Sequence, residues 1–132
     1  MGAEARPADW IGYALIKLKR AYDPPAPEDG FRFLVDRIHP RGVKKDALHI
    51  EAWLKDSAPS DALRKWFAHD ASRWNEFCQR YFAELDAHPE AWNPLLEAAR
   101  SGNVTLLFAA HDLERNNAAA LKMYLDKYIK RK

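Results

Sequence analysis

Acidic and basic side chains directly follow two of the most apolar segments of the chain. Asp36 and Arg37 come after the segment FRFLV, and His111 and Asp112 come after VTLLFAA. A carboxylate at a ligand site can act as an acid or a base, and arginine binds phosphate and carboxylate groups. We therefore take Asp36 and Asp112 as candidate catalytic residues, with Arg37 and His111 as candidate ligand-binding residues.

Further candidates for binding an anion lie near the same points of the sequence. Arg41 belongs to a Pro-Arg-Gly turn that His39 precedes, and Lys55 follows another apolar segment. Asn116 and Asn117 lie where a C-terminal helix is expected to begin. The free backbone N–H groups at the start of a helix attract anions. We expect these five residues to contribute to ligand binding.

Each of these groups also has a purely structural interpretation. Asp36 and Arg37 can form an internal ion pair that anchors a turn. Gly42 can give the Pro-Arg-Gly segment the backbone freedom of a turn. Asp112 or Asn116 can simply cap a helix. The sequence leaves these alternatives open.

The same residues include possible metal ligands but no known metal or nucleotide motif. His39, His111, Asp36 and Asp112 offer the right atoms for a metal, but no HxxxH or CxxC spacing accompanies them. We therefore predict no metal centre. The chain contains no P-loop, no GxGxxG and no GxSxG element. P-loop nucleoside-triphosphate sites, dinucleotide sites and the nucleophile elbow of hydrolases are therefore excluded, and no cofactor is indicated.

Four short segments have the hydrophobic pattern of strands. Residues 11–19 and 47–54 alternate apolar and polar side chains, and residues 31–36 place Phe31, Phe33 and Val35 on one face. Residues 104–110 form a continuous apolar run, which is typical of a strand buried on both faces. Residues 47–54 also fit a helical stripe, but we predict a strand there.

Helices are predicted in the middle and at the end of the chain. Ser60 and Asp70 can cap two of them, Pro89 suits the first turn of a third, and a fourth begins near Asn116. Their apolar residues recur at the spacing i, i+3, i+4 that gives a helix one buried face.

This order of elements predicts one small α/β domain. We expect a central, mostly parallel sheet of three or four strands, flanked by about five helices. Residues 1–9 are expected to be a disordered lead-in, and residues 10–132 to form the domain. The proline-rich loop at 20–30 and the link at 38–46 are short for parallel crossovers, so the direction of the strands stays open.

Composition excludes several classes of protein. The chain has 132 residues and a net charge of +2, so no strong field favours nucleic acid, and nucleic-acid binding is not expected. Its longest apolar run is far short of the roughly 20 residues that a membrane span requires, and no signal-peptide pattern is seen. The single cysteine, Cys78, rules out an internal disulfide. We expect a cytoplasmic protein of unassigned oligomeric state.

Several blocks of the sequence resemble a known family. The blocks are YDPPAPEDGFRFLVDRIHPRG, AWLKDSAPS, LRKWFAHD, RWNEFCQRY and VTLLFAAHD, in this order. Over residues 14–128 the chain is similar to the YeaO-like family of domains of unknown function. The resemblance therefore supports the predicted fold but implies no assigned activity.

Two positions depart from the pattern of that family. His39 occupies a position where the family usually has tryptophan before Pro-Arg-Gly. Larger relatives have a Cys-His-Arg element after the last strand, where this chain reads Glu114-Arg115-Asn116-Asn117. The resemblance therefore implies that any sulfur chemistry of those relatives lacks its nucleophile here.

The leading hypothesis for function is a site where the strands end. Ligands of open α/β sheets bind outside the carboxyl ends of the strands. We expect an anionic or nucleotide-like small molecule there, with acid/base catalysis by the two aspartates as an open question. The alternative is a non-catalytic binding or regulatory module. It would use the Arg- and aromatic-rich helical region 64–81, including Arg64, Arg73 and Arg80, to engage a protein or nucleic-acid partner.

Overall fold

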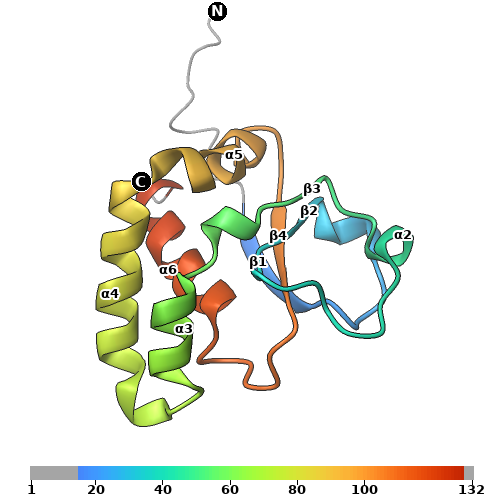
Figure 1. Cartoon of the computed structure of the whole chain (residues 1–132). Coiled ribbons are helices and arrows are strands. Elements are labelled where there is room, and N and C mark those ends of the chain that lie inside the picture. The colour runs from blue at the N-terminus through green and yellow to red at the C-terminus, as the bar shows by residue number, and fades with distance from the viewer. Residues whose placement is uncertain (1–14, 130–132) are drawn as a thin grey trace, which may run out of the picture.

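The apolar run at 104–108 forms the central strand of a four-stranded sheet. This strand, β4 (Val104–Phe108), pairs with β1 (Ile16–Arg20) on one edge and with β2 (Phe31–Leu34) on the other. A two-residue strand, β3 (Ala52–Trp53), extends the sheet beyond β2, which gives the order β1-β4-β2-β3. The structure, a computed structural model, describes residues 15–129 (Figure 1).

All three strand pairings are parallel, which settles the direction left open by the sequence. The loop after β1 therefore crosses from the carboxyl end of β1 to the amino end of β2, and β4 lies between these two strands. Parallel pairing brings the carboxyl ends of the strands to one edge of the sheet. Arg20 and Phe108, the last residues of β1 and β4, lie in register there.

Among residues 15–129, five helices flank the sheet, and four of them gather on one face. These four are α3 (Asp61–Phe67), α4 (Trp74–Ala87), α5 (Pro89–Ala99) and α6 (Asn117–Ile129) (Figure 1). The fifth, α2 (Lys45–Leu48), lies on the opposite side of the sheet. The predicted class and architecture, an α/β domain with a parallel sheet, are therefore confirmed.

The predicted helix starts depend on side-chain caps. The Ser60 hydroxyl accepts a hydrogen bond from the Leu63 amide and so caps α3. Asp70 caps the 3₁₀ turn Ala71–Arg73, through which the chain enters α4. Glu84 of α4 accepts hydrogen bonds from the Ser60 amide and hydroxyl, at 2.9 and 2.6 Å, which joins α4 to the start of α3.

Strand β4 is buried on both faces, as its continuous apolar sequence predicts. Val104, Leu106 and Phe108 belong to the large core under the helices. Leu107 faces the other way, into a smaller core with Leu34 and Leu48.

The prediction of a strand over residues 47–54 is wrong for most of that segment. Leu48 ends helix α2, His49 adopts a left-handed conformation with φ 48°, and only residues 52–53 pair as a strand. The competing interactions are tertiary. Leu48 is fully buried in the smaller core, and its carbonyl accepts two hydrogen bonds from the Arg32 guanidinium.

A buried carboxylate fastens the proline-rich loop to the sheet. The Asp29 carboxylate accepts hydrogen bonds from Arg32 at 2.6 Å, from Lys19 at 3.0 Å and from the Ala26 amide at 2.9 Å. Burial alone would raise the pKa of Asp29, but these hydrogen bonds and the charge of Lys19 outweigh it and hold the pKa below 3.8. The Asp29 carbonyl also accepts the hydroxyl of Thr105 in β4.

Some expectations concern residues outside the described range. The disordered lead-in at 1–9 and the first part of the strand predicted at 11–19 lie there. Within residues 15–129, no helix is long and apolar enough to cross a membrane.

The backbone geometry predicts very different costs for alanine at two glycines. Gly30 has φ 67°, and a Cβ there would clash with the backbone carbonyl of Asn103. Gly42 has φ 81°, but a Cβ there would meet no atom within 4 Å. We expect Gly42→Ala to lower the free energy of unfolding by about 1–2 kcal/mol, the cost of a positive φ alone. Gly30→Ala should cost clearly more.

Urea unfolding of both variants and the wild type measures the two costs. Equal losses of stability would contradict the close approach between Gly30 and Asn103.

Candidate ligand-binding pocket

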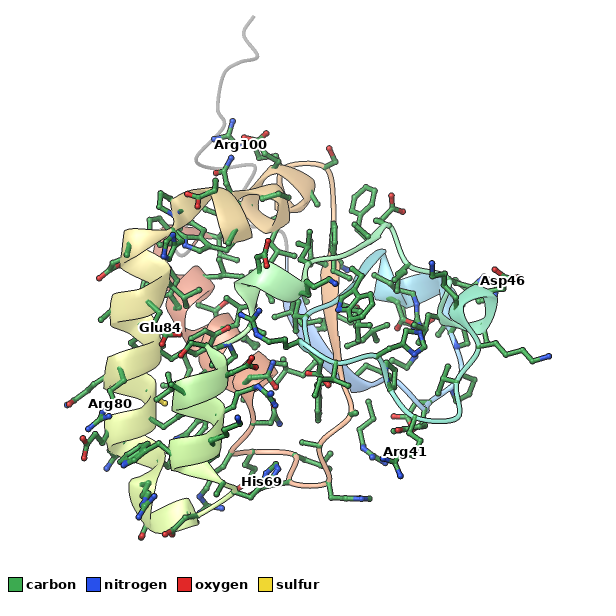
Figure 2. All side chains as sticks on the ribbon, in the orientation of Figure 1. Arg41, Asp46, His69, Arg80, Glu84 and Arg100 are labelled. Carbon is green, nitrogen blue, oxygen red and sulfur yellow. The ribbon has the colours of Figure 1, made fainter. Side chains whose placement is uncertain are left out.

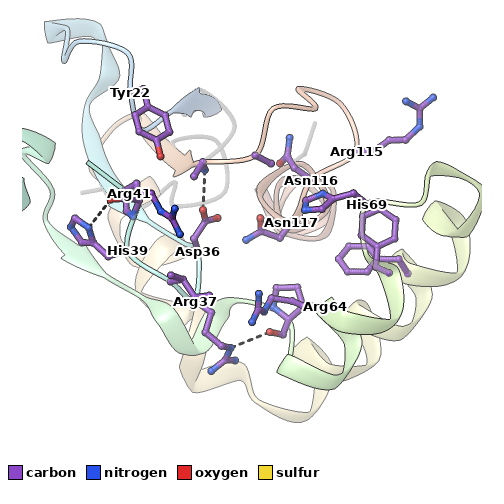
Figure 3. A pocket seen from close by; sticks show the side chains of 17 residues that line it. Tyr22, Asp36, Arg37, His39, Arg41, Arg64, His69, Arg115, Asn116 and Asn117 are labelled. Carbon is purple, nitrogen blue, oxygen red and sulfur yellow. Dashed lines mark hydrogen bonds between the residues drawn. The ribbon is translucent and has the colours of Figure 1, made fainter. Parts of the chain in front are cut away.

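A cavity of 380 Å³ lies at the carboxyl ends of the strands. The segment 36–41 after β2, the loop 109–117 after β4 and residues of α3 form its walls (Figure 3). We call it the strand-end pocket. Six of the nine residues proposed from the sequence line it, namely Asp36, Arg37, His39, Arg41, Asn116 and Asn117. The structure thus brings these six together, while their roles stay predictions.

The other three proposed residues lie outside the lining of this pocket. Lys55 stacks on the indole ring of Trp53, with its ammonium nitrogen 4.8 Å from the ring centre. His111 is exposed in the loop after β4. Asp112 is also exposed there, and its carboxylate accepts hydrogen bonds from the amides of Arg115 and Glu114. These bonds lower the pKa of Asp112, so its visible role is to hold a turn.

Among the described residues, Asp36 is the only carboxylate in the lining of the strand-end pocket. Its Oδ2 accepts a hydrogen bond of 2.9 Å from the Ala109 amide, which links the end of β2 to the end of β4. Desolvation raises the pKa of Asp36, although the hydrogen bond from the Ala109 amide, the nearby Asn117 side chain and the charge of Arg64 oppose the rise. Among the described residues Asp36 forms no ion pair with Arg37, contrary to that alternative interpretation.

Three buried side-chain atoms of the described residues have no hydrogen-bond partner, and all three belong to residues of this pocket. They are Oδ1 of Asp36, Nε2 of His39 and Nε of Arg64. Buried polar atoms in folded proteins are nearly always bonded, because an unpaired one costs about 1–3 kcal/mol. Their concentration at one cavity makes it the candidate site for a polar ligand.

Four arginines line the strand-end pocket, and most of them are already engaged. Arg37 donates to the carbonyls of Pro59 and Ala58, at 3.2 and 3.3 Å. Arg64 donates to Asp61 at 2.9 Å, and Arg115 lies 3.8 Å from Asp112. Arg41 is exposed and has no hydrogen bond or ion pair with any residue of 15–129. Its guanidinium is therefore available for an anion.

The two asparagines tie the start of α6 to the rest of the pocket. The Asn116 side chain accepts the Ala119 amide at 2.7 Å, so it caps the helix, and it donates to the Asp112 carbonyl. The capping interpretation of Asn116 is thus correct. Asn117 donates to the Val35 carbonyl at 3.2 Å, which holds α6 against the end of β2.

His69 is a pocket residue that the sequence analysis did not propose. It follows the C-terminus of α3, where Ala68 and His69 both have positive φ angles, 46° and 60°. Two successive non-glycine residues in this conformation carry strain, and such strain is often found at functional sites. Figure 3 shows His69 across the cavity from Arg41, beside Asn116. The sequence offers no signal for this turn beyond the Asp70 cap.

Only two of the three arginines of the alternative surface lie together. Arg73 and Arg80 stack on the indole of Trp66, at 5.0 and 4.4 Å from its centre. Arg64 lines the strand-end pocket instead. Two residues that are two positions apart on a helix point in nearly opposite directions. Arg64 and Trp66 therefore lie on opposite sides of α3.

The described residues offer neither an accessible thiol nor a cluster of metal ligands. Cys78 is buried in the core under the helices, and desolvation raises its pKa to about 11, so its thiol is poorly reactive. Within residues 15–129, no group of three or more His, Cys, Asp and Glu side chains could hold a metal ion.

Comparison with known proteins identifies similar sequences over most of the chain. The profile described as the inactive DUF488-N3 subclade matches residues 15–132. The uncharacterized protein YeaO of Escherichia coli strain K12 is 39% identical over 110 residues, which cover 83% of this chain and 96% of YeaO. The uncharacterized protein Mb3100c of Mycobacterium bovis is 38% identical over 111 residues, covering 84% and 93%. No solved structure gives a significant match.

The raised pKa of Asp36 predicts a pH-dependent effect of Asp36→Asn. A carboxyl group with a higher pKa in the folded state than in the unfolded state stabilises the fold while protonated. This contribution is lost as the pH rises through the folded-state pKa, which lies above 3.8. We expect the stability of Asp36→Asn, relative to the wild type, to increase between about pH 3 and about pH 7.

Chemical unfolding of both proteins across this pH range tests the expectation. A difference in the free energy of unfolding that is constant, or that falls with pH, would contradict a desolvated carboxyl group at this position.

Proposed function

Because the chain belongs to the YeaO-like DUF488 family and to its inactive DUF488-N3 subclade, we propose that it binds an anionic small molecule without transforming it. The ligand would occupy the strand-end pocket. The observation that carries this proposal is the set of three buried, unpartnered polar atoms on Asp36, His39 and Arg64. A ligand that bonds to them would remove their desolvation cost.

The charge of the lining favours an anion. Arg37, Arg41, Arg64 and Arg115 contribute four positive charges, and Asp36 is the only carboxylate among the described residues of the lining. The fixed charges on the walls of a cleft attract a ligand of opposite sign. Arg41 would make the principal contact, because its side chain is not engaged by any described residue. The position of the pocket, at the carboxyl ends of parallel strands, agrees with ligand sites in related architectures.

The lining of the pocket supports binding more than catalysis. Glu114-Arg115-Asn116-Asn117 occupies the stretch where larger relatives have a Cys-His-Arg element, and Cys78 is buried in the core under the helices. Asp112, proposed as a second acid or base, lies outside the lining and holds a turn. Without Asp112, Asp36 has no second carboxylate in the described lining with which to form a general acid/base pair.

The partner-binding alternative has weaker support. Its surface is reduced to Trp66, Arg73 and Arg80, and both arginines also pair with acidic neighbours on the same helical segment. As part of our proposal we retain the cytoplasm as the location, on the basis of the single cysteine.

Thermal unfolding in the presence of inorganic phosphate tests the proposed function. A ligand at 100 times its dissociation constant stabilises the folded state by about 2.7 kcal/mol. We expect phosphate to raise the melting temperature of the wild type, and we expect Arg41→Ala to lose most of this increase. Arg100→Ala is the matched control, because Arg100 lies at the far end of the molecule (Figure 2).

The two arginine variants must give different results for the proposal to stand. If phosphate stabilised Arg41→Ala as strongly as Arg100→Ala, anion binding by Arg41 in this pocket would be excluded. A wild type that neither phosphate nor a phosphate ester stabilises would exclude the proposed function.

A further inference from the structure

We infer that the ligand of the strand-end pocket carries an O–H or N–H donor for Asp36 besides its anionic group, as a phosphate ester of a sugar or a nucleoside does. This inference rests on the proposed function and specifies the class of ligand. A bare inorganic anion would satisfy the arginines but not the carboxylate.

The Asp36 carboxylate is held in one orientation. Its Oδ2 accepts the Ala109 amide at 2.9 Å, and the backbone carbonyl of Asp36 accepts the Trp53 indole N–H at 2.6 Å. Oδ1 is buried and has no partner among the described residues. Figure 3 shows this carboxyl group in the pocket, between Arg41 and Asn117. Asp36 therefore holds an unpartnered acceptor in a fixed position in the wall of the pocket.

An acceptor inside an anion site discriminates between ligands. A carboxylate oxygen repels phosphate oxygens, which are also acceptors, and it binds hydroxyl or amide donors. Hydrogen bonds to charged groups contribute more than neutral ones, and an unmet buried acceptor is costly. Asp36 would therefore weaken the binding of inorganic phosphate and strengthen the binding of an ester that places a donor at Oδ1.

The size and the rim of the pocket suit a larger molecule than phosphate. The cavity volume of 380 Å³ lies in the range of sites for organic ligands. Two large hydrophobic side chains of the lining are unusually exposed, Tyr22 at 44% and Ile38 at 62%. An apolar sugar face or a nucleobase would cover them, whereas inorganic phosphate would not.

A sugar phosphate and a nucleotide share one chemistry, because each has a phosphate group joined to a ring that carries hydrogen-bond donors. A nucleobase adds a flat surface that can stack on an aromatic ring such as Tyr22. A comparison of ribose 5-phosphate with the nucleoside 5′-monophosphates therefore distinguishes the two classes of ligand.

The first test compares ligands on the wild-type protein by calorimetric titration. Ribose 5-phosphate or a nucleoside 5′-monophosphate should bind about tenfold more tightly than methyl phosphate, which has the ester but no donor. Tighter binding of a nucleotide than of ribose 5-phosphate would identify nucleotides as the class of ligand. Equal binding of the donor-bearing esters and methyl phosphate would overturn the inference without use of a variant.

The second test is Asp36→Asn. In this variant the side-chain oxygen would keep the bond from the Ala109 amide, so the new NH₂ group would replace the unpartnered acceptor. We expect the donor-bearing ester to bind about tenfold more weakly, and inorganic phosphate to bind severalfold more tightly. Asp46→Asn, on α2 and away from this pocket (Figure 2), removes the same charge as a control.

The outcomes separate the inference from the proposed function. If Asp36→Asn changed both affinities in the same direction, Asp36 would act only through its charge, and the inference would fail while anion binding stood. If neither phosphate nor any ester bound the wild type, or Arg41→Ala bound them unchanged, the proposed function would fail and the inference with it.

Discussion

Strand β4 is hydrogen-bonded along both of its edges, and all five of its side chains are buried. Because its two neighbours run parallel to it, the segments that leave β1, β2 and β4 emerge at one edge of the sheet. The Asp36–Ala109 hydrogen bond then holds two of these segments together. The helices that cover one face of the sheet bring Arg64 and His69 to the same edge. The strand-end pocket thus exists because β4 is central.

Asp29, which is buried, and Asp36, which is half-buried, show how differently the fold can compensate the same residue type. Asp29 is surrounded by donors from Lys19, Arg32 and Ala26, and its pKa is lowered. Asp36 has an amide donor on Oδ2 but no partner on Oδ1, and its pKa is raised by desolvation. The first carboxylate is fully compensated within the fold. The second is compensated only in part, which is the condition expected of a group that meets a ligand.

Local patterns predicted the elements whose signals are local, such as the buried strand at 104–108 and the cap at Ser60. They failed at 47–54, where two partial periodicities competed and tertiary contacts of Leu48 decided the outcome. The pocket was predictable to the extent that parallel strands place their ends together. The contributions of Arg64 and His69 to the pocket were not predictable, because they depend on how α3 packs and on a strained turn after it.

The central strand is also the last of the described strands in chain order. While the chain is being synthesised, β1 has no neighbour to pair with until residues 104–108 have left the ribosome, and β2 has only the two-residue β3. Pairing across so many residues is slow, and apolar segments that wait for it are exposed to aggregation. The sheet of the described residues can therefore close only after residues 104–108 have emerged, and until then the nascent chain carries an incomplete sheet.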